Sequence, residues 1–272
     1  AMGPGGKGSN QAVAAARAGA KTRFISRLGK DSFGDIAMAT WAAEGIDAKV
    51  ARSSQAPTGA AFIYVNDVNG ENAIIVVPGA AGDISITDVE AEAETIRSSR
   101  VFVTQLEQPA AAALRALEIA RAARVITIFN PAPAAPFDPA IYPLVDYITP
   151  NESEAAAMVG FSVESVDDAR RAGDVLLSKG VGVALITLGE KGALFHAKDQ
   201  STLVPAFHVA PVIETAGAGD AFNGGFAAAL AEGQAPLAAA RFGCAVAGIA
   251  VTRAGTAPAM PKRAEVNAIL AR

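Results

Sequence analysis

The chain has 272 residues, and 23 lysines and arginines stand against 27 aspartates and glutamates, so its formal net charge at neutral pH is −4. That balance does not favour a nucleic-acid partner. Apolar residues make up 51% of the chain and charged residues 18%, which is enough to build a large core and excludes a disordered chain. The single cysteine excludes an internal disulfide, and no apolar run reaches the roughly 18 to 20 residues that span a bilayer. We therefore expect a globular, cytoplasmic protein with neither nucleic-acid nor membrane partners.

Segments of helical composition alternate with continuous apolar runs through most of the chain. After a glycine cluster at residues 3–8, a helix is expected over 9–18. The expected strands are 24–28, 101–103, 125–129, 145–148 and 183–188, and the later expected helices are 110–122, 167–178, 218–231, 236–252 and 261–270. This alternation is typical of βαβ units around a parallel sheet whose strands are buried on both faces. The predicted fold class is α/β, with a doubly wound, mostly parallel sheet and helices on both faces.

One region departs from that pattern. Residues 58–65 and 72–77 are two extended segments, and the connecting residues 66–71 contain an Asn-Gly pair, a turn signal of β-hairpins. Strands joined by a tight turn are antiparallel, so this hairpin does not fit easily into a sheet built by crossover helices. We expect it to form a small separate sheet or flap over one edge of the main body.

The sequence ETAGAGD at 214–220 is a candidate phosphate site. It lies between an extended run, 202–212, and the helix expected from 218, and the start of a helix presents free N–H groups and a positive dipole end to anions. Gly217 and Gly219 allow close approach of the backbone, and Asp220 lies within reach of a hydroxyl beside the anion. A carboxylate next to an anion site suits phosphoryl transfer to an alcohol. Alternatively, Asp220 only caps the helix and the glycines form an ordinary turn.

Three further segments are candidate binding loops: a glycine-rich turn near the start of the sequence and two turns that follow expected strands. The sequence GGKGSN at 5–10 superficially resembles a phosphate-binding P-loop, but a P-loop has Ser or Thr after its Lys, and Gly8 stands there instead. The turn still presents the ammonium of Lys7 and the amide of Asn10, which suit the hydroxyls of a polar substrate. Residues 187–192 and 150–154 each follow an expected strand, where open α/β sheets bind ligands, although each is alternatively a plain strand-to-helix turn.

The other reactive side chains are expected to be structural. His196 and His208 are the only histidines and have no metal-ligand spacing around them, so we expect them at the surface or in packing roles. Cys244 lies in an apolar helical segment and is expected to be a small core residue. The sequence contains no Gly-x-Ser-x-Gly elbow and no His-Glu-x-x-His pair, so hydrolase functions lose their usual support.

Taken in order, six segments resemble the ribokinase family of sugar kinases, the PfkB-type carbohydrate kinases. They are GGKGSNQAVA at 5–14, QLE at 105–107, NPAPA at 130–134, TPNE at 149–152, ITLG at 186–189 and GAGDAFNG at 217–224. The resemblance covers essentially the whole chain and implies one ribokinase-like kinase domain over 1–272, with the hairpin at 56–78 inserted as a small β-sheet lid. It also implies ATP-dependent phosphorylation of a sugar hydroxyl, with D-ribose going to D-ribose 5-phosphate in the ribokinase branch.

The resemblance further implies roles for individual residues. Asp220 would receive the hydroxyl proton, and the anion hole would be formed by the backbone amides of Ala216, Gly217, Ala218 and Gly219. The sugar would be held by Gly6, Lys7, Asn10, Glu107 and Asp220. ATP would lie along Asn151, Thr187, Leu188, Gly189, Glu190, Lys191, Gly192 and Gly219, with Mg²⁺ bridging its phosphates mostly through water. A monovalent cation, usually K⁺, would be held at Glu214, Ala216, Ala250, Arg253, Gly255 and Ala259.

Two departures from the family pattern bear on these expectations. The family commonly has Asp where this chain has Glu214, one methylene longer, so we expect a shifted or weakened cation site. The family also begins with a strand and a turn ending in a substrate-binding Asp, and nothing before Ala1 matches them, so we expect the sheet to lack a central strand. Family members pair through their lids, which implies a homodimer. The alternatives are a related kinase for deoxyribose, fructose or a nucleoside, and a non-catalytic protein that binds a sugar or a nucleotide.

Overall fold

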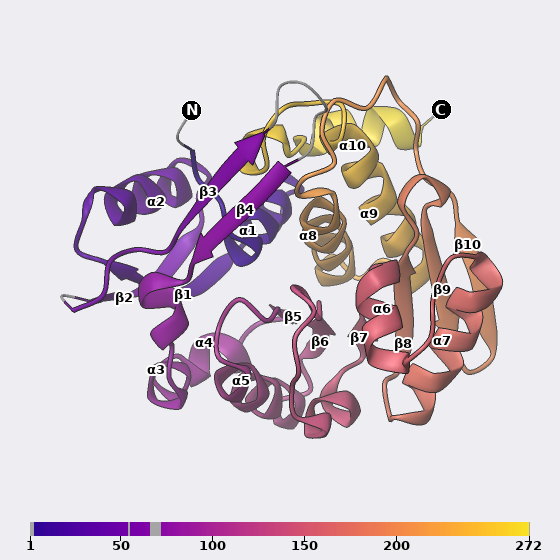
Figure 1. Ribbon diagram of the computed structural model, residues 1–272, viewed down its shortest axis with the longest axis horizontal. Helices are drawn as coiled ribbons and strands as arrows, with labels where there is room; N and C mark the ends of the chain where they lie inside the picture. The colour runs from indigo at the N-terminus through magenta and orange to yellow at the C-terminus, as the bar shows by residue number, and fades with distance from the viewer. Residues whose placement is uncertain (1–2, 54, 66–71, 272) are drawn as a thin grey trace.

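The computed structural model describes residues 3–53, 55–65 and 72–271. At its centre lies a six-stranded sheet in the order β10-β9-β8-β7-β6-β5 (Figure 1). Its strands are β5 (Val101–Thr104), β6 (Ile126–Phe129), β7 (Tyr147–Ile148), β8 (Val183–Thr187), β9 (Ala193–Ala197) and β10 (Gln200–Val204). Strands β5 to β8 run parallel, whereas β9 and β10 form an antiparallel hairpin at one edge. The predicted mostly parallel sheet is confirmed.

Helices cover both faces of this sheet, as predicted for a doubly wound fold. One core contains residues of α1 (Lys7–Arg17), α8 (Ala218–Ala231) and α9 (Pro236–Ala250), and the other contains residues of α5 (Ala110–Ala122), α6 (Glu152–Val159) and α7 (Val166–Ser178) (Figure 1). Leu185 and Phe195 belong to the first core, whereas their neighbours Ile186 and Leu194 belong to the second. Successive residues of a strand face opposite sides, so a continuous apolar run produces a sheet that is buried on both faces.

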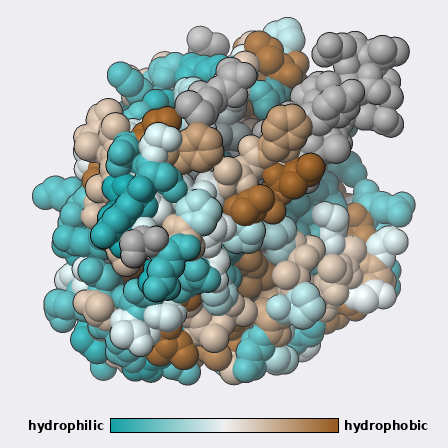
Figure 2. Space-filling view, turned by 60° about the vertical axis from the view of Figure 1, so that its left-hand side comes forward, coloured by the Kyte–Doolittle hydropathy of each residue, from teal (hydrophilic) through white to brown (hydrophobic). Residues whose placement is uncertain are grey.

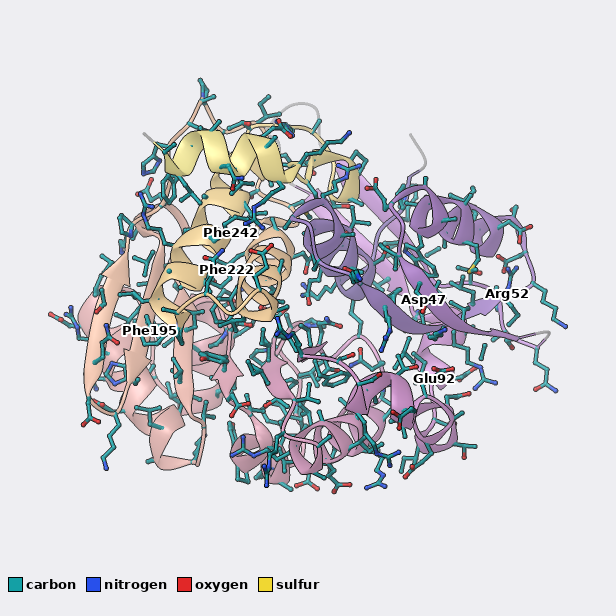
Figure 3. All side chains as sticks on the ribbon, turned by 180° about the vertical axis from the view of Figure 1, so that it is seen from behind. Asp47, Arg52, Glu92, Phe195, Phe222 and Phe242 are labelled. Atoms are coloured by element: carbon teal, nitrogen blue, oxygen red, sulfur yellow. The ribbon has the colours of Figure 1, made fainter. Side chains whose placement is uncertain are left out.

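The first core fixes the helix that carries the candidate catalytic motif. Figure 3 views the molecule from behind and labels Phe195 of β9, Phe222 of α8 and Phe242 of α9, which belong to the core between the two helices and the sheet. Their exposed fractions are 4%, 2% and 2%. Burying a side chain of this size contributes roughly 1.5–3 kcal/mol, so α8 is held firmly against α9 and the sheet. The first turn of α8 contains Asp220.

A second parallel pair lies beside the main sheet. It consists of β1 (Arg23–Gly29) and β2 (Asp47–Ser53), which are connected by α2 (Ser32–Ala43). In the part of the chain that is described, β1 and β5 are edge strands of two separate sheets, and the expected lack of a central strand stays a prediction. The remaining elements are η1 (Gly79–Asp83), α3 (Ile86–Ala91), α4 (Ala93–Arg97), η2 (Pro139–Leu144), η3 (Gly189–Lys191), η4 (Ala257–Ala259) and α10 (Arg263–Leu270). Across the described ranges, no helix combines the length and the apolar character needed to cross a membrane.

The expected hairpin forms a two-stranded antiparallel sheet of its own. Its strands are β3 (Ala60–Val65) and β4 (Asn72–Val77), and the predicted turn at 66–71 lies outside the described residues. Phe62 pairs directly with Ile75, and each is 64% exposed. In Figure 2, brown, hydrophobic surface lies next to the grey residues at the upper right of the molecule. The hairpin therefore presents apolar side chains to solvent, which is unusual for a two-stranded sheet without a partner.

Several predicted elements are shorter than expected, among them the following three. The extended run predicted over 202–212 ends as β10 at Val204, because Pro205 has no N–H to continue the ladder. The strand predicted over 145–148 is reduced to Tyr147–Ile148, since Val145 closes the preceding 3₁₀ helix with a hydrogen bond from its N–H to the Tyr142 carbonyl. The last helix begins at Arg263, two residues after the proline that was expected to start it.

The reactivity of the Cys244 thiol is a direct test of whether α9 is buried. The residue is 5% exposed, as predicted for a core position, and burial raises the pKa of its thiol to about 12. Because the thiolate is the reactive form, we expect the native protein to resist alkylation and the denatured protein to react normally. Iodoacetamide labelling at neutral pH, followed by intact-mass measurement with and without guanidinium chloride, measures this. Fast labelling of the native protein would contradict the burial of Cys244.

Candidate functional site

A cavity of about 120 Å³ opens at the carboxyl ends of the parallel strands, where α8 begins. Asn130 follows β6, Thr149 follows β7 and Thr187 ends β8, so three neighbouring strands each deliver a polar residue to it. The full lining consists of Lys7, Asn130, Ala132, Thr149, Asn151, Glu154, Thr187, Thr215, Gly217, Ala218, Gly219, Asp220 and Asn223. The structure thus brings the predicted catalytic motif, which includes Gly219 and Asp220, together with Lys7 as a further predicted sugar-binding residue. Two further predicted ATP-binding residues, Asn151 and Thr187, join them at the sheet edge where α/β folds bind ligands.

The wall formed by α8 supplies backbone donors. Gly217 precedes the helix at φ 78°, in the left-handed region that favours glycine. The Ala218 N–H already donates to the Thr215 carbonyl at 3.1 Å, so this amide of the predicted anion hole has a partner. The amides of Gly219 and Asp220 lie in the first turn, where the helix itself offers no acceptor. An anion bound there would also face the positive end of a 14-residue helix.

The carboxylate of Asp220 is 6% exposed and is hydrogen-bonded through both oxygens to α1. Asn10 Nδ2 donates to Oδ2 at 2.9 Å, and Gln11 Nε2 donates to Oδ1 at 3.0 Å. The N-cap residue of α8 is Gly217, which has no side chain, and both Asp220 oxygens bond to α1 instead, so the alternative that Asp220 is only a helix cap is wrong. Each carboxylate oxygen keeps a second lone-pair site, which leaves room to accept a hydrogen bond from a hydroxyl in the cavity.

The surroundings of Asp220 make it a stronger base than a solvated carboxylate. Burial raises the pKa of its carboxyl above the ordinary value. The ammonium of Lys7 and the amide donors of Asn10 and Gln11 lower this pKa, and the negative charge of Glu107 raises it. Burial outweighs the opposing groups, so the carboxylate is suited to take a proton from an alcohol bound beside it.

The predicted sugar-binding residues meet at the start of α1. Glu107, in the loop after β5, accepts a hydrogen bond from the Lys7 backbone N–H at 2.7 Å, and a Cβ on Gly6 would lie 3.7 Å from the same carboxylate oxygen. The Lys7 side chain belongs to the cavity lining that also contains Asp220. Asn10 is 4% exposed, and among the described residues its Oδ1 has no hydrogen-bond partner. Because an unpaired buried carbonyl oxygen costs free energy, a ligand hydroxyl that donates to Asn10 Oδ1 would be favoured.

The predicted ATP-binding residues fall into two groups. Asn151 and Thr187 line the cavity from neighbouring strand ends, which a parallel bridge joins. Residues 188–192 turn back around η3 and are not among the lining residues. Leu188 is 3% exposed in the second core, and the Lys191 ammonium donates to a backbone carbonyl at 3.0 Å. Any contact that the backbone of this turn makes with ATP therefore lies outside the cavity.

Glu154 is a second buried carboxylate in the lining; the sequence placed it in the candidate binding loop 150–154 without a role of its own. It is 8% exposed, and it exchanges hydrogen bonds with Asn151: the Asn151 N–H donates to Glu154 Oε2 at 2.9 Å, and the Glu154 N–H donates to Asn151 Oδ1 at 2.8 Å. Burial raises its pKa, and the charge of Asp220 adds to the increase. The Asn-x-x-Glu capping spacing directly after an expected strand was the signal that could have identified it.

Four further buried polar residues were also missed as site residues: Asn130, Thr149 and Asn223 line the cavity, and Gln11 contacts Asp220 without lining it. Gln11 Nε2 donates to Asn130 Oδ1 at 3.1 Å, in addition to its bond to Asp220. Asn130 Nδ2 donates to the Thr149 carbonyl at 2.8 Å, and Thr149 Oγ1 donates to Asn223 Oδ1 at 2.7 Å. A polar residue directly after a buried strand, as at Asn130 and Thr149, is the only local signal for this group.

The predicted cation-binding residues come from two stretches of chain that pack together beside the start of α8. The stretch before α8 contributes Glu214 and Ala216, and the stretch from the last residue of α9 to η4 contributes Ala250, Arg253, Gly255 and Ala259. Glu214 Oε2 accepts a hydrogen bond from the Gly255 N–H at 2.7 Å, and the Glu214 N–H donates to the Val251 carbonyl at 3.2 Å. The Ala250 carbonyl accepts the Arg253 N–H at 3.1 Å. Over the described residues, no cluster of three or more His, Cys, Asp or Glu side chains could hold a metal ion.

Comparisons with known proteins agree on one family. A model of the pfkB family carbohydrate kinases matches residues 1–263. A ribokinase from Haemophilus influenzae is 42% identical over 262 residues, which are 96% of this chain and 85% of the relative. A deoxyribokinase from Salmonella typhi is 35% identical over 271 residues, which are 99% of this chain and 88% of the relative. The structure of Arabidopsis thaliana ribokinase complexed with ribose and ATP aligns with a TM-score of 0.89 at 29% identity, covering 98% of this chain and 87% of that one.

Proposed function

Because the chain belongs to the pfkB family of carbohydrate kinases, it is an ATP-dependent sugar kinase, and we propose that its acceptor is D-ribose, which it converts to D-ribose 5-phosphate. One observation carries the proposal: a buried carboxylate, Asp220, faces the same cavity as the free amides at the start of α8. A proton acceptor and an anion site in one cavity are the two groups that phosphoryl transfer to an alcohol needs.

The proposed reaction assigns each group one task. The sugar hydroxyl donates to Asp220, whose carboxylate takes the proton as the hydroxyl oxygen bonds to the γ-phosphorus. The bond between the γ-phosphorus and the β–γ bridging oxygen breaks, and ADP leaves with the electron pair. The amides of Gly219 and Asp220 stabilise the negative charge on the transferring oxygens. Lys7 and Asn10 hold the sugar, and Asn151 and Thr187 contact the nucleotide side of the cavity.

Mg²⁺ is the proposed metal cofactor, and the lining residues fit it. The ion, when bound with ATP, neutralises phosphate charge and is held mostly by phosphate oxygens and water. Glu154 supplies a buried carboxylate that lines the cavity with Asp220, which suits it to hold water molecules of the hydrated ion. With an ion nearby, Glu154 would ionise more readily than its raised pKa implies.

A coupled assay of ADP release with ribose, ATP and Mg²⁺ tests the proposed function. We expect kcat/KM for ribose to exceed that for 2-deoxyribose and fructose. Deoxyribose is the second candidate, because one relative is a deoxyribokinase and the two sugars differ by one hydroxyl. A site that hydrogen-bonds a hydroxyl discriminates strongly against the analogue that lacks it, so the ratio is informative. A preference for deoxyribose would mean that deoxyribose, and not ribose, is the substrate. Binding of both ribose and ATP without formation of product would favour the non-catalytic alternative.

The monovalent-cation site leads to a prediction about Glu214. Its carboxylate bonds the Gly255 N–H at 2.7 Å, and the side chain is one methylene longer than the family's usual Asp. Shortening it withdraws the carboxylate from Gly255 and restores the family's pattern. We therefore expect Glu214→Asp to increase the activation of turnover by K⁺ relative to Na⁺ by several-fold. Glu118→Asp, at an exposed helix position, is the control, and an unchanged response of the Glu214 variant to K⁺ would argue against a cation site here.

The exposed hairpin leads to a prediction about assembly, since we propose that two chains pair through their lids as a homodimer. The cross-strand partners Phe62 and Ile75 are each 64% exposed, and Val77, on the same face of the hairpin as Ile75, is 53% exposed. Burying such a surface against a second copy removes it from water, which stabilises a dimer.

We expect Phe62→Glu to convert the dimer to a monomer, because a carboxylate at this face would have to be desolvated on pairing. Sedimentation velocity measures the change. Ile86→Glu is the matched control, since Ile86 is 49% exposed at the start of α3, outside the hairpin. A wild-type chain that is monomeric at all concentrations, or a Phe62 variant that still dimerises, would reject pairing through the lid.

The remaining assignments extend this proposal. We propose that residues 1–272 act as one kinase domain in which 56–78 is the inserted lid. We also propose that the protein works in the cytoplasm, where ATP is available, in agreement with a composition that contains one cysteine.

A further inference from the structure

Two glutamine side chains lie behind the candidate base without facing the cavity. Gln11 is 4% exposed and Gln105 is 7% exposed, and neither is among the lining residues. Gln11 nevertheless donates to Asp220 Oδ1 at 3.0 Å, so it contacts the base although it does not line the cavity. A glutamine in this place does not serve substrate binding in the mechanism above. What it does follows from the orientation of its amide.

That orientation is dictated by a backbone carbonyl. A carbonyl can only accept, so the Thr149 carbonyl requires the NH₂ end of Asn130, which donates to it at 2.8 Å. The Asn130 oxygen is then turned toward Gln11 and requires an NH₂ group there, which Gln11 Nε2 supplies at 3.1 Å. Gln11 Nε2 is also the amide atom that lies next to Asp220. The hydrogen bonds from Thr149 through Asn130 therefore make Gln11 present a donor to the Asp220 carboxylate.

The other end of Gln11 is fixed as well. Gln11 Oε1 accepts a hydrogen bond from Gln105 Nε2 at 2.5 Å, so the amide cannot rotate without losing partners at both ends. Gln105 follows β5, Asn130 follows β6 and Thr149 follows β7. This series of hydrogen bonds is therefore anchored on three adjacent strands of the central sheet. A buried network whose amides hold one another in this way is rigid.

We propose that Gln11, held by Gln105 and Asn130, is a positioning residue that keeps Asp220 oriented and ionised between turnovers. The inference rests on the proposed kinase function and adds to it the groups that control the base. A hydrogen-bond donor stabilises the charged form of a carboxylate, so Gln11 opposes the effect of burial on Asp220. Without it, the carboxyl would hold its proton to higher pH and would be free to turn about its side-chain bonds.

A second arm of the network ends at the phosphate side. Thr149 Oγ1 donates to Asn223 Oδ1 at 2.7 Å, and Asn223 Nδ2 donates to the Gly219 carbonyl at 2.8 Å. This arm supports the first turn of α8 without touching the Asp220 carboxylate. The two arms share Thr149, but they use different atoms of it: the carbonyl serves the base, and the hydroxyl serves the anion site.

The pH dependence of kcat/KM for the sugar separates these roles. The charged groups around Asp220 are Lys7 on α1, Glu107 after β5 and Glu154 on α6, and all three are retained in the variants. We expect Gln11→Met, which keeps the volume and removes the donor, to lower kcat about tenfold. The acidic limb of the profile should move up by about one pH unit, while KM for ATP stays unchanged. Gln105→Met should shift the limb in the same direction by less.

Two further variants serve as comparisons. Thr149→Val removes only the hydroxyl arm, so kcat should fall without movement of the acidic limb. Thr127→Val deletes another buried hydroxyl, on β6, whose hydrogen-bond partners are Leu144 and Asp146 rather than residues of the network. It should lower the melting temperature and leave the pH profile in place. If the Gln11 variant does not fold, the Gln105 variant carries the test.

An acidic limb that superimposes on the wild type in both glutamine variants would overturn the inference. So would a change confined to KM for the sugar, which would make Gln11 a substrate-binding residue. These outcomes are separate from failure of the proposed function, because turnover of a sugar by the wild-type chain is measured first.

Discussion

Asp220→Asn should lower kcat by about 10²–10⁴-fold while leaving the affinity for ATP nearly unchanged. The variant keeps the size of the side chain and removes its ability to accept the hydroxyl proton. Its remaining oxygen can accept from only one of the two α1 amides that now donate to separate carboxylate oxygens at 2.9 and 3.0 Å. Initial-rate kinetics with ribose and calorimetric titration of ATP measure the two effects. Wild-type turnover by this variant would reject the assigned base.

The pH profile adds a second test of the same assignment. Burial raises the pKa of Asp220, and the base works only when ionised, so wild-type kcat/KM should fall on the acidic side. The residual activity of Asp220→Asn should not show that limb, because the titrating group is gone. Asp168→Asn is the matched control, since Asp168 occupies the same position in the first turn of α7 but caps that helix with Ser165. It should lose some stability and keep both kcat and the limb.

Gly224→Ala should destabilise the protein and weaken sugar turnover together. Alanine normally favours a helix over glycine by roughly 1 kcal/mol. Here, however, the added Cβ would lie 2.5 Å from the Gln11 carbonyl oxygen and 2.9 Å from the Ala15 nitrogen, both backbone atoms of α1. A side chain could rotate away, but a helix backbone must move as a whole. The sign of the usual glycine-to-alanine effect is therefore reversed at this position.

The displaced helix connects stability to function. Helix α1 carries Lys7, Asn10 and Gln11, so its shift moves the sugar-binding groups and the partners of Asp220 together. We expect overpacking to cost about 2 kcal/mol, to lower the melting temperature by about 5 °C, and to reduce kcat/KM for ribose at least tenfold. Calorimetric melting and steady-state kinetics measure both. Gly3→Ala, which meets open space, is the control. An unchanged or raised melting temperature would contradict the close approach of α1 and α8.

Local patterns were sufficient for most elements and for the core of the candidate phosphate site. The helices predicted over 110–122 and 218–231 have those bounds in the structure. The hydrophobic period of a helix and the residues that end it can both be recognised within a short stretch of sequence. The apolar runs predicted the parallel strands for the same reason. The Gly-Ala-Gly-Asp motif placed donors and a carboxylate at one helix start, which is a property of the first turn alone.

Contacts between distant segments needed the tertiary structure. The sequence left open whether Asp220 only caps its helix, and the fold decided against a cap because it places Asn10 and Gln11, 210 and 209 residues away along the chain, against the carboxylate. Neighbouring strands end side by side, and this brings Glu154, Asn130 and Thr149 into the site. The order of strands in a sheet cannot be predicted from the hydrophobic pattern of any one segment. Burial and hydrogen-bond partners depend on segments that are distant in the sequence. The electrostatic environment of a residue is therefore determined only in the folded structure.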